Sequence, residues 1–178
     1  INPAGPLQLI IQNKIMSSII FWGPPGVGKT TLARILPTEL NRVIFHEISA
    51  VSSGTADLKS IFKSAQESKV NGKSFLLFVD EIHYFNKMQQ DMFLPIIEDG
   101  TLSLIGATSQ NPSFQLNAAL LSRSLVFEVR KLTNIALEEI IKRAEKVLQK
   151  PLPLNTKCRN ALIEKSGGDA RILINLLE

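Results

Sequence analysis

The stretch SIIFWGPPGVGKT, residues 18–30, joins an apolar strand pattern to a glycine-rich motif. Its first five residues form a short apolar run that is typical of a buried β-strand, and this run ends in glycine and prolines. The segment GPPGVGKT, residues 23–30, then matches the pattern G-x-x-x-x-G-K-[S/T]. A helix is expected from about residue 28 to residue 36. Strand, glycine-rich loop and helix in this order are the context in which the motif binds phosphate groups.

The expected loop combines backbone donors with two side-chain ligands. Its glycines let N–H groups close around phosphate oxygens, and the following helix adds its positive end. We expect Lys29 to reach the β- and γ-phosphates of ATP and the Thr30 hydroxyl to ligate Mg²⁺. The alternative is a glycine-rich turn that matches by chance. The predicted nucleotide-binding residues are Gly23, Pro24, Pro25, Gly26, Val27, Gly28, Lys29, Thr30 and Thr31.

A second chemical motif follows the segment FLLFV, residues 75–79, which is apolar on both faces as a central parallel strand should be. Asp80 and Glu81 come at its carboxyl end, where open α/β sheets bind ligands. We predict that Asp80 holds Mg²⁺ through water and that Glu81 polarises the attacking water. The alternative is that the two acids only cap the next helix.

The two histidines have weaker signals. His83 completes a D-E-x-H box, which read alone suggests a helicase. A histidine in this position is more often a packing or hydrogen-bonding residue than a catalytic one. His46 lies in HEISA, which lacks the second histidine of the H-E-x-x-H zinc motif.

Strand and helix patterns alternate up to residue 131 and then become entirely helical. This alternation predicts an α/β fold of the P-loop NTPase type, with a parallel sheet flanked by helices on both sides. We expect two domains: an α/β nucleotide-binding domain over residues 1–131, and a small all-helical lid over 132–178 that is incomplete at its C-terminus. The expected strands are 18–22, 42–49, 75–79, 102–108 and 124–129, and the expected helices of the first domain are 28–36, 55–70 and 86–97.

The helical tail begins where Thr133 or Asn134 can cap a helix. PLPL at 151–154 ends this helix, and another is expected across 155–165. Gly167 and Gly168 follow, and then a last helix runs to Glu178. The apolar face predicted for the first of these helices consists of Leu137, Ile140, Ile141, Ala144 and Leu148.

Three further residues are candidates for the site. Ser109, with Thr108 and Asn111 nearby, follows a strand expected beside that of Asp80, so it could orient the attacking water. Arg123 stands immediately before an apolar strand, where a lone arginine is usually a surface charge. Arg171 falls in the first turn of the last helix, where a cation opposes the helix dipole, so we expect an anionic partner such as a γ-phosphate.

Composition adds broad limits. The formal net charge is +4, with +2 in residues 1–131 and +2 in 132–178, so no basic tail indicates nucleic-acid binding. Cys158 is the only cysteine, which fits a reducing cytoplasm. No apolar run reaches membrane-spanning length, and no signal peptide is visible. The chain begins at Ile1 without a methionine, so we expect it to be a piece of a longer protein.

These motifs, in this order, resemble the AAA+ ATPases of the clamp-loader branch. GPPGVGKT looks like Walker A and LLFVDE like Walker B. Ser109 looks like sensor 1, Arg123 of LSR like the arginine finger, and Arg171 of GDAR like sensor 2. Two arginines and a helical lid, in place of a second RecA-like domain, indicate that D-E-x-H here is a Walker B motif and not a helicase box.

The resemblance narrows to the replication-associated recombination protein A family, which is related to the Werner-helicase-interacting protein. FVDEIHYFNKMQQDMFLPIIEDGTLSLIGAT, NPSFQLNAALLSR and GGDAR carry it, and it covers nearly the whole chain. It implies DNA-stimulated ATP hydrolysis at stalled replication forks by a homo-oligomer in the cytoplasm, at the nucleoid. The implied partners are single-stranded or forked DNA and single-strand-binding protein. The sequence departs from the family at Tyr84, where arginine is usual.

Two questions stay open at this level. A clamp-loader-like subunit that uses ATP binding as a switch, with little hydrolysis, is the alternative to a hydrolysing motor. Lys59, Lys63 and Lys87 are candidate DNA contacts, although a solvated helix face is the more ordinary explanation.

Overall fold

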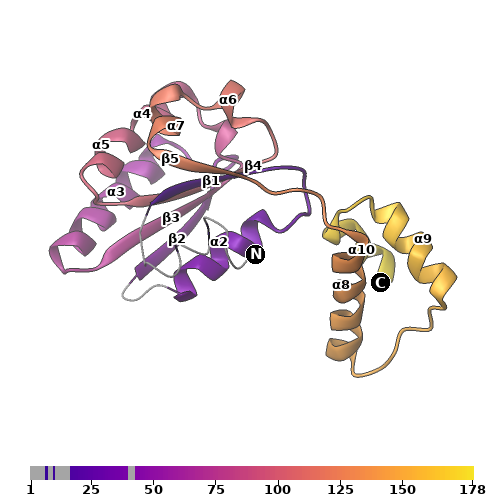
Figure 1. The fold of residues 1–178 in the computed structure, drawn as a ribbon. Helices are drawn as coiled ribbons and strands as arrows, with labels where there is room; N and C mark the ends of the chain where they lie inside the picture. Colours follow the sequence, from indigo (N-terminus) through magenta and orange to yellow (C-terminus); the bar gives the residue numbers. More distant parts are fainter. Residues whose placement is uncertain (1–6, 8–9, 11–16, 40–42) are drawn as a thin grey trace. The chain divides into compact units, whose positions relative to one another are not determined.

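The computed structural model describes Leu7, Ile10 and residues 17–39 and 43–178. The chain forms two compact units (Figure 1). The sheet unit consists of Ile1–Trp22 and Lys29–Glu128, and the helical unit consists of Gly23–Gly28 and Val129–Glu178. The first residue of the strand expected at 42–49 falls outside the described residues. No helix within the described ranges is long and apolar enough to cross a membrane.

Among the described residues, five strands form one sheet in the order β2-β3-β4-β1-β5. Every neighbouring pair is parallel, which confirms the predicted fold class. All five carboxyl ends therefore lie at one edge of the sheet. The strands are β1 (Ser18–Trp22), β2 (Val43–Ser49), β3 (Ser74–Asp80), β4 (Ser103–Thr108) and β5 (Ser124–Glu128).

Helices cover both faces of this sheet (Figure 1). On one face, α3 (Thr55–Val70), α5 (Phe93–Glu98) and α7 (Ala118–Ser122) pack on alternate strand residues such as Leu77 and Val79. On the other face lies α2 (Lys29–Ile35), which continues into the 3-10 turn η1 (Leu36–Glu39). Because both faces are covered, Phe75–Val79 of β3 is buried throughout, which explains its continuous apolar sequence.

The segment after β3 differs from the single helix expected over 86–97. A 3-10 turn, η2 (Ile82–Tyr84), comes first, followed by α4 (Lys87–Asp91) and then α5. Pro95 has no N–H to donate to the carbonyl four residues earlier, so a continuous helix cannot form there. Two short helices were also not expected: α6 (Pro112–Gln115) and α7, whose N-caps are Asn111 and Asn117.

The helical unit contains α8 (Asn134–Leu148), α9 (Thr156–Ser166) and α10 (Ala170–Leu177). Thr133 caps α8, as the sequence allowed. Leu148, at the end of the predicted apolar face, is half exposed. The predicted division into a nucleotide-binding domain, 1–131, and a lid, 132–178, stays a prediction. The buried core of the unit consists of Leu137, Ile141, Ile163 and Leu173.

Gly106 allows η2 to pack directly on the sheet. A Cβ at this position in β4 would lie 2.7 Å from Cδ1 of Ile20 and 3.1 Å from Cδ1 of Ile82. Both isoleucines are fully buried, so neither side chain can move into solvent. The missing side chain therefore makes room for Ile82, and this contact fixes the turn that carries His83.

We expect Gly106→Ala to destabilise the sheet unit by about 1–3 kcal/mol, because it overpacks a closed core. Ile20→Val removes the closest atom, Cδ1, and costs about 0.5–1.5 kcal/mol alone. The double variant is then expected to be more stable than the sum of the two by about 0.5 kcal/mol or more. Urea unfolding of the four proteins measures this coupling. Strictly additive effects would contradict the packing argument.

Candidate active site

The carboxyl edge of the sheet brings the sequence-predicted acids together with polar residues of the neighbouring strand. Trp22, the last residue of β1, is paired in register with Thr108, the last residue of β4. Asp80 is the last residue of β3, and β3 pairs with β4 on the side of β4 that faces away from β1. The segments that follow β3 and β4 therefore start side by side, as the sequence predicted.

The glycine-rich loop 23–28 is held by the start of α10 within the helical unit. The Ala170 N–H donates a 2.9 Å hydrogen bond to the Gly26 carbonyl. Gly26 has a φ of +67°, and a Cβ there would lie 1.7 Å from Oδ1 of Asp169. Only glycine fits this position, because any side chain would both strain the backbone and collide with the cap of α10.

Lys29 and Thr30 open α2 at the end of this loop. Lys29 is 7% exposed, which is rare for a lysine and requires compensation by polar or charged groups. Its charge acts on Asp80, whose pKa it lowers. The position is the one that the loop motif needs for a cation facing phosphates.

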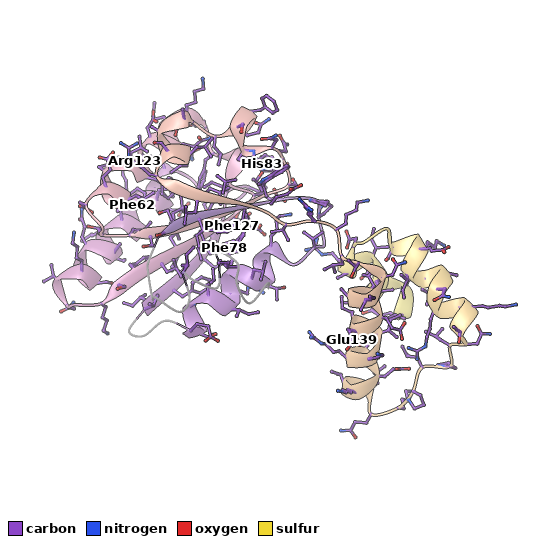
Figure 2. All side chains as sticks on the ribbon, in the orientation of Figure 1. Phe62, Phe78, His83, Arg123, Phe127 and Glu139 are labelled. Atoms are coloured by element: carbon purple, nitrogen blue, oxygen red, sulfur yellow. The ribbon has the colours of Figure 1, made fainter. Side chains whose placement is uncertain are left out.

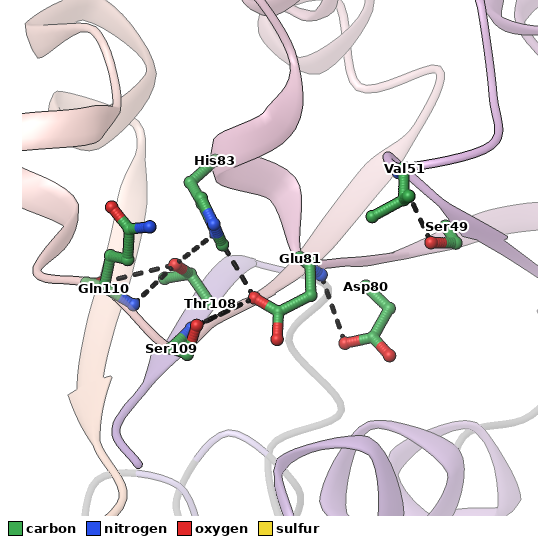
Figure 3. Close-up of polar contacts among 8 residues, drawn as sticks. All are labelled: Ser49, Val51, Asp80, Glu81, His83, Thr108, Ser109 and Gln110. Atoms are coloured by element: carbon green, nitrogen blue, oxygen red, sulfur yellow. Dashed lines mark hydrogen bonds and ion pairs between the residues drawn. The ribbon is translucent and has the colours of Figure 1, made fainter. Parts of the chain in front are cut away.

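Glu81 is the centre of a hydrogen-bond network at the start of η2 (Figure 3). Its φ of 49° and ψ of 46° are left-handed, which is uncommon for a residue other than glycine. One carboxylate oxygen, Oε2, accepts from the N–H and the Oγ–H of Ser109, both at 3.2 Å. Nδ1 of His83 lies 3.2 Å from the same oxygen. The left-handed turn thus directs Glu81 toward the end of β4.

Asp80 lies beside Glu81 but is held differently. Its Oδ1 accepts the Glu81 N–H at 3.1 Å. Burial, followed by repulsion from Glu81, raises the pKa of Asp80, whereas the Glu81 N–H and Lys29 lower it. A half-buried carboxylate next to a second one favours a cation, because a cation relieves both costs.

Ser109 lies where the sequence predicted, but its neighbours have other tasks. The Thr108 hydroxyl contacts Nδ1 of His83 at 2.9 Å. Asn111 caps α6 by accepting from the Ser113 N–H at 3.0 Å, so it does not join Ser109. Sequence reasoning also missed the contact between His83 and Glu81, which no spacing rule signals. The role of Ser109 in orienting water stays a prediction.

Arg123 lies at the opposite edge of the sheet. It caps the end of α7 and precedes β5, so it stands at the amino ends of the strands. Figure 2 shows it away from His83. Its guanidinium forms an ion pair with Glu98 at 2.5 Å and donates to the Ala119 carbonyl at 2.9 Å. The side chain is 38% exposed.

Arg171 lies in the first turn of α10, and its side chain is exposed. Asp169 caps the helix and accepts the backbone N–H groups of Arg171 and Ile172 at 2.7 and 3.0 Å. The cap supplies a negative charge to this helix end, so a partner outside the helix is not required by the dipole alone. The expected γ-phosphate contact stays a prediction.

Comparison with known protein families assigns this chain to one of them. The profile of the ATPase family associated with various cellular activities (AAA) matches residues 19–132. The chain belongs to this family. Membership in the AAA family implies a nucleotide-binding domain, and the matched range holds the loop motif, Asp80, Glu81, Ser109 and Arg123.

Comparison with individual AAA proteins narrows the assignment within this family. Replication-associated recombination protein A of Haemophilus influenzae is 43% identical over 100% of this chain, which covers 41% of that protein. The protein of the same name in Escherichia coli K12 is 42% identical over 97% of the chain, with 40% of its own length covered. ATPase WRNIP1 of Dictyostelium discoideum is 46% identical over 97% of the chain, with 20% covered. The resemblance found from the sequence motifs is confirmed, and the chain spans about two fifths of the length of these bacterial relatives.

A solved AAA+ structure supports the same assignment. The Thermotoga maritima RuvB Holliday junction branch migration motor superposes with a TM-score of 0.78 at 31% identity. The match covers 96% of this chain and 56% of the RuvB chain. This chain thus shares the fold of its AAA domain with a protein that is named as a branch migration motor of Holliday junctions.

We expect Asp80→Asn to make the metal-free protein more stable near neutral pH. The raised pKa means that ionisation of Asp80 favours the unfolded chain, in which aspartate has its ordinary pKa near 3.9. The stability that protonated Asp80 contributes to the folded state is therefore fully present below the unfolded pKa. This contribution is lost as the pH rises through the folded pKa. Urea unfolding at pH 4 and pH 7 tests this. The stability gain of the variant is expected to be larger at pH 7, and an equal or smaller gain there would contradict it.

Proposed function

We propose that this chain binds ATP with Mg²⁺ and hydrolyses the γ-phosphate bond as the motor part of a DNA-maintenance protein. One observation carries the proposal: the Glu81 carboxylate is held beside Ser109 at the carboxyl edge of the sheet, with Asp80 next to it. A carboxylate fixed by one oxygen can use the other to accept a proton from water. This is the geometry that phosphoryl transfer to water requires.

The other residues bind and orient the nucleotide. Backbone N–H groups of residues 23–28 and the start of α2 suit phosphate oxygens. Lys29 neutralises the β- and γ-phosphates, and Ser109 and Arg171 contact the γ-phosphate or the attacking water. These roles rest on the positions of the residues in the motif and on AAA membership.

Mg²⁺ fits the donor set of this edge. Within the described ranges, no group of three or more histidine, cysteine or acidic residues could hold a metal ion by itself. Mg²⁺ typically keeps several waters and is bound by one or two protein oxygens together with substrate phosphates. The Thr30 hydroxyl and the Asp80 carboxylate supply such oxygens, and the raised pKa of Asp80 marks it as the group that gains most from a cation.

Arg123 is proposed to act on a neighbouring subunit. It stands at the amino ends of the strands, whereas Glu81 follows their carboxyl ends. A strand of six residues such as β4 spans about 20 Å, which is far longer than an arginine side chain. An arginine finger that serves the site of its own chain would have to lie at the carboxyl edge of the sheet, where Glu81 is. A homo-oligomer, in which one subunit offers Arg123 to the next, removes this difficulty.

The names of the relatives suggest the biological setting. Replication-associated recombination protein A and the RuvB branch migration motor indicate work on DNA in replication, recombination and repair. We propose single-stranded or forked DNA and single-strand-binding protein as partners, in the cytoplasm at the nucleoid. Lys59, Lys63 and Lys87 are exposed, which permits DNA contact on α3 and α4. The alternative, a clamp-loader-like subunit that binds ATP only as a switch, is disfavoured by the intact Lys29, Glu81 and Arg123.

Lys29→Ala and Glu81→Gln are expected to separate binding from chemistry. The first removes a cation from the phosphates, so nucleotide affinity falls. The second keeps the shape of the side chain but removes the base, so affinity is retained and turnover drops by about 100-fold or more. Calorimetry and steady-state ATPase assays of the complete protein, with and without single-stranded DNA, measure both. Unchanged affinity in Lys29→Ala rejects the phosphate loop, and unchanged turnover in Glu81→Gln rejects hydrolysis at this site.

Arg123→Ala is expected to remove most activity of the complete oligomer, since arginine fingers contribute roughly 10³–10⁵ in rate in other NTPases. Mixing Arg123→Ala with Glu81→Gln subunits is expected to restore part of the turnover. Interfaces that pair an intact Glu81 with an intact Arg123 form only in the mixture. Arg143→Ala, at an exposed position on α8, is the control. If the mixture stays as inactive as its components, action between subunits is wrong.

A further inference from the structure

The contacts of the Glu81 carboxylate are one-sided. All of those that the described residues provide, from the Ser109 N–H, the Ser109 hydroxyl and the His83 ring, meet the same oxygen, Oε2. Figure 3 shows the other oxygen pointing away from these three groups. A carboxylate held in this way can rotate only by losing several hydrogen bonds at once. The histidine that only seemed to imitate a helicase box is one of its supports.

The position of a proton on His83 follows from its neighbours. Nδ1 lies 3.2 Å from Oε2 of Glu81 and 2.9 Å from Oγ1 of Thr108. If Nδ1 were bare, its lone pair would face a carboxylate oxygen, and two acceptors would repel each other. If Nδ1 carries hydrogen, it donates to Glu81 or Thr108. The Thr108 hydroxyl then donates to the Gln110 carbonyl at 3.3 Å and accepts the Gln110 N–H at 3.0 Å. Hydrogen on Nδ1 therefore avoids the repulsion between two acceptors and leaves both contacts of Thr108 with Gln110 in place.

The imidazole ring itself is fixed by packing. The His83 side chain is 6% exposed, although it lies on a surface turn. The ring of Tyr84 covers it, with ring centroids 4.5 Å apart and a tilt of 35°. On the inner side, fully buried Ile82 anchors the same turn against Gly106. Tyr84 therefore forms an aromatic cover that helps to hold the ring in place.

We propose that His83 is a positioning residue for ATP hydrolysis, which donates Nδ1–H to Oε2 of Glu81 and so directs Oε1 toward the attacking water. His83 does not contact the reacting atoms in this scheme. It acts through Glu81, together with Ser109 on the same oxygen. The inference rests on the proposed function, since a carboxylate that activates no water needs no such aim. It deepens that function by adding a residue for which the motif implied only packing or hydrogen bonding.

Three substitutions at one position separate the hydrogen bond from the shape of the ring. The Asn amide nitrogen lies as many bonds from Cβ as Nδ1 does, whereas the Gln amide nitrogen corresponds to Nε2. His83→Phe keeps an aromatic ring and has no donor. We expect kcat to fall about 10- to 100-fold in His83→Phe and in His83→Gln, because a small misplacement of a catalytic group has an effect of this size. His83→Asn is expected to keep kcat within about fivefold of the parent.

The controls separate positioning from stability and from binding. ATP affinity and the unfolding temperature are measured for each variant of the complete protein, and both are expected to stay near the parent values for His83→Asn and His83→Gln. The same three substitutions at His46, the exposed histidine on β2, are expected to leave kcat unchanged. A purely structural role would favour Gln over Asn, since Gln is closer in volume to histidine.

Four outcomes decide the inference. The order Asn above Gln and Phe in kcat, at equal ATP affinity, supports it. Equal kcat in all three variants and the parent overturns it and leaves the ATPase proposal standing, provided that Glu81→Gln is inactive. A higher kcat in His83→Phe also overturns it, because the hydrogen bond would then restrain Glu81 from reacting. A parent protein without Glu81-dependent hydrolysis rejects both the proposed function and this inference.

Discussion

The contact between Ile82 and the bare backbone of Gly106 determines how the chain leaves β3. A buried strand must turn at the edge of the sheet, and here the next side chain returns at once to the core. This return requires the left-handed conformation of Glu81, which costs on the order of 1 kcal/mol or more. Buried packing of Ile82 offsets that cost. The strained residue is therefore also the one whose carboxylate is proposed to activate water.

The parallel register extends this local geometry into a site. Because β3 pairs with β4, the polar residues after β4 arrive beside Glu81 without any further loop. Ser109 meets the carboxylate, and Thr108 meets the histidine that supports it. The segment after β3 supplies Glu81 and His83, and the end of β4 supplies Thr108 and Ser109. The site is thus built from consecutive residues on two strands, and its precision depends on a sheet that is buried on both faces.

The sequence predicted the elements that depend on local pattern, and it failed where tertiary contacts decide. Periodicity placed all five strands and α3 closely, because apolar runs and helical spacing are properties of a few neighbouring residues. The helix expected over 86–97 is interrupted at Met92, because Pro95 cannot donate the hydrogen bond that a continuous helix needs there. The network around His83 could not be predicted, because it joins residues 25 positions apart through a turn whose conformation no spacing reveals. The glycine that permits this turn, Gly106, has no signal of its own in the strand pattern.

The two edges of the sheet hold opposite kinds of charge chemistry. The carboxyl edge keeps acids half buried and in need of a cation, whereas the amino edge keeps Arg123 paired with Glu98. That pair is about half exposed, and such surface pairs contribute only about 0–1 kcal/mol. Under the proposed action between subunits, a phosphate, which carries more negative charge than one carboxylate, can take Arg123 from Glu98 at little cost. Glu98 therefore holds Arg123 without binding it firmly, which suits the proposed contact of this arginine with a neighbouring subunit.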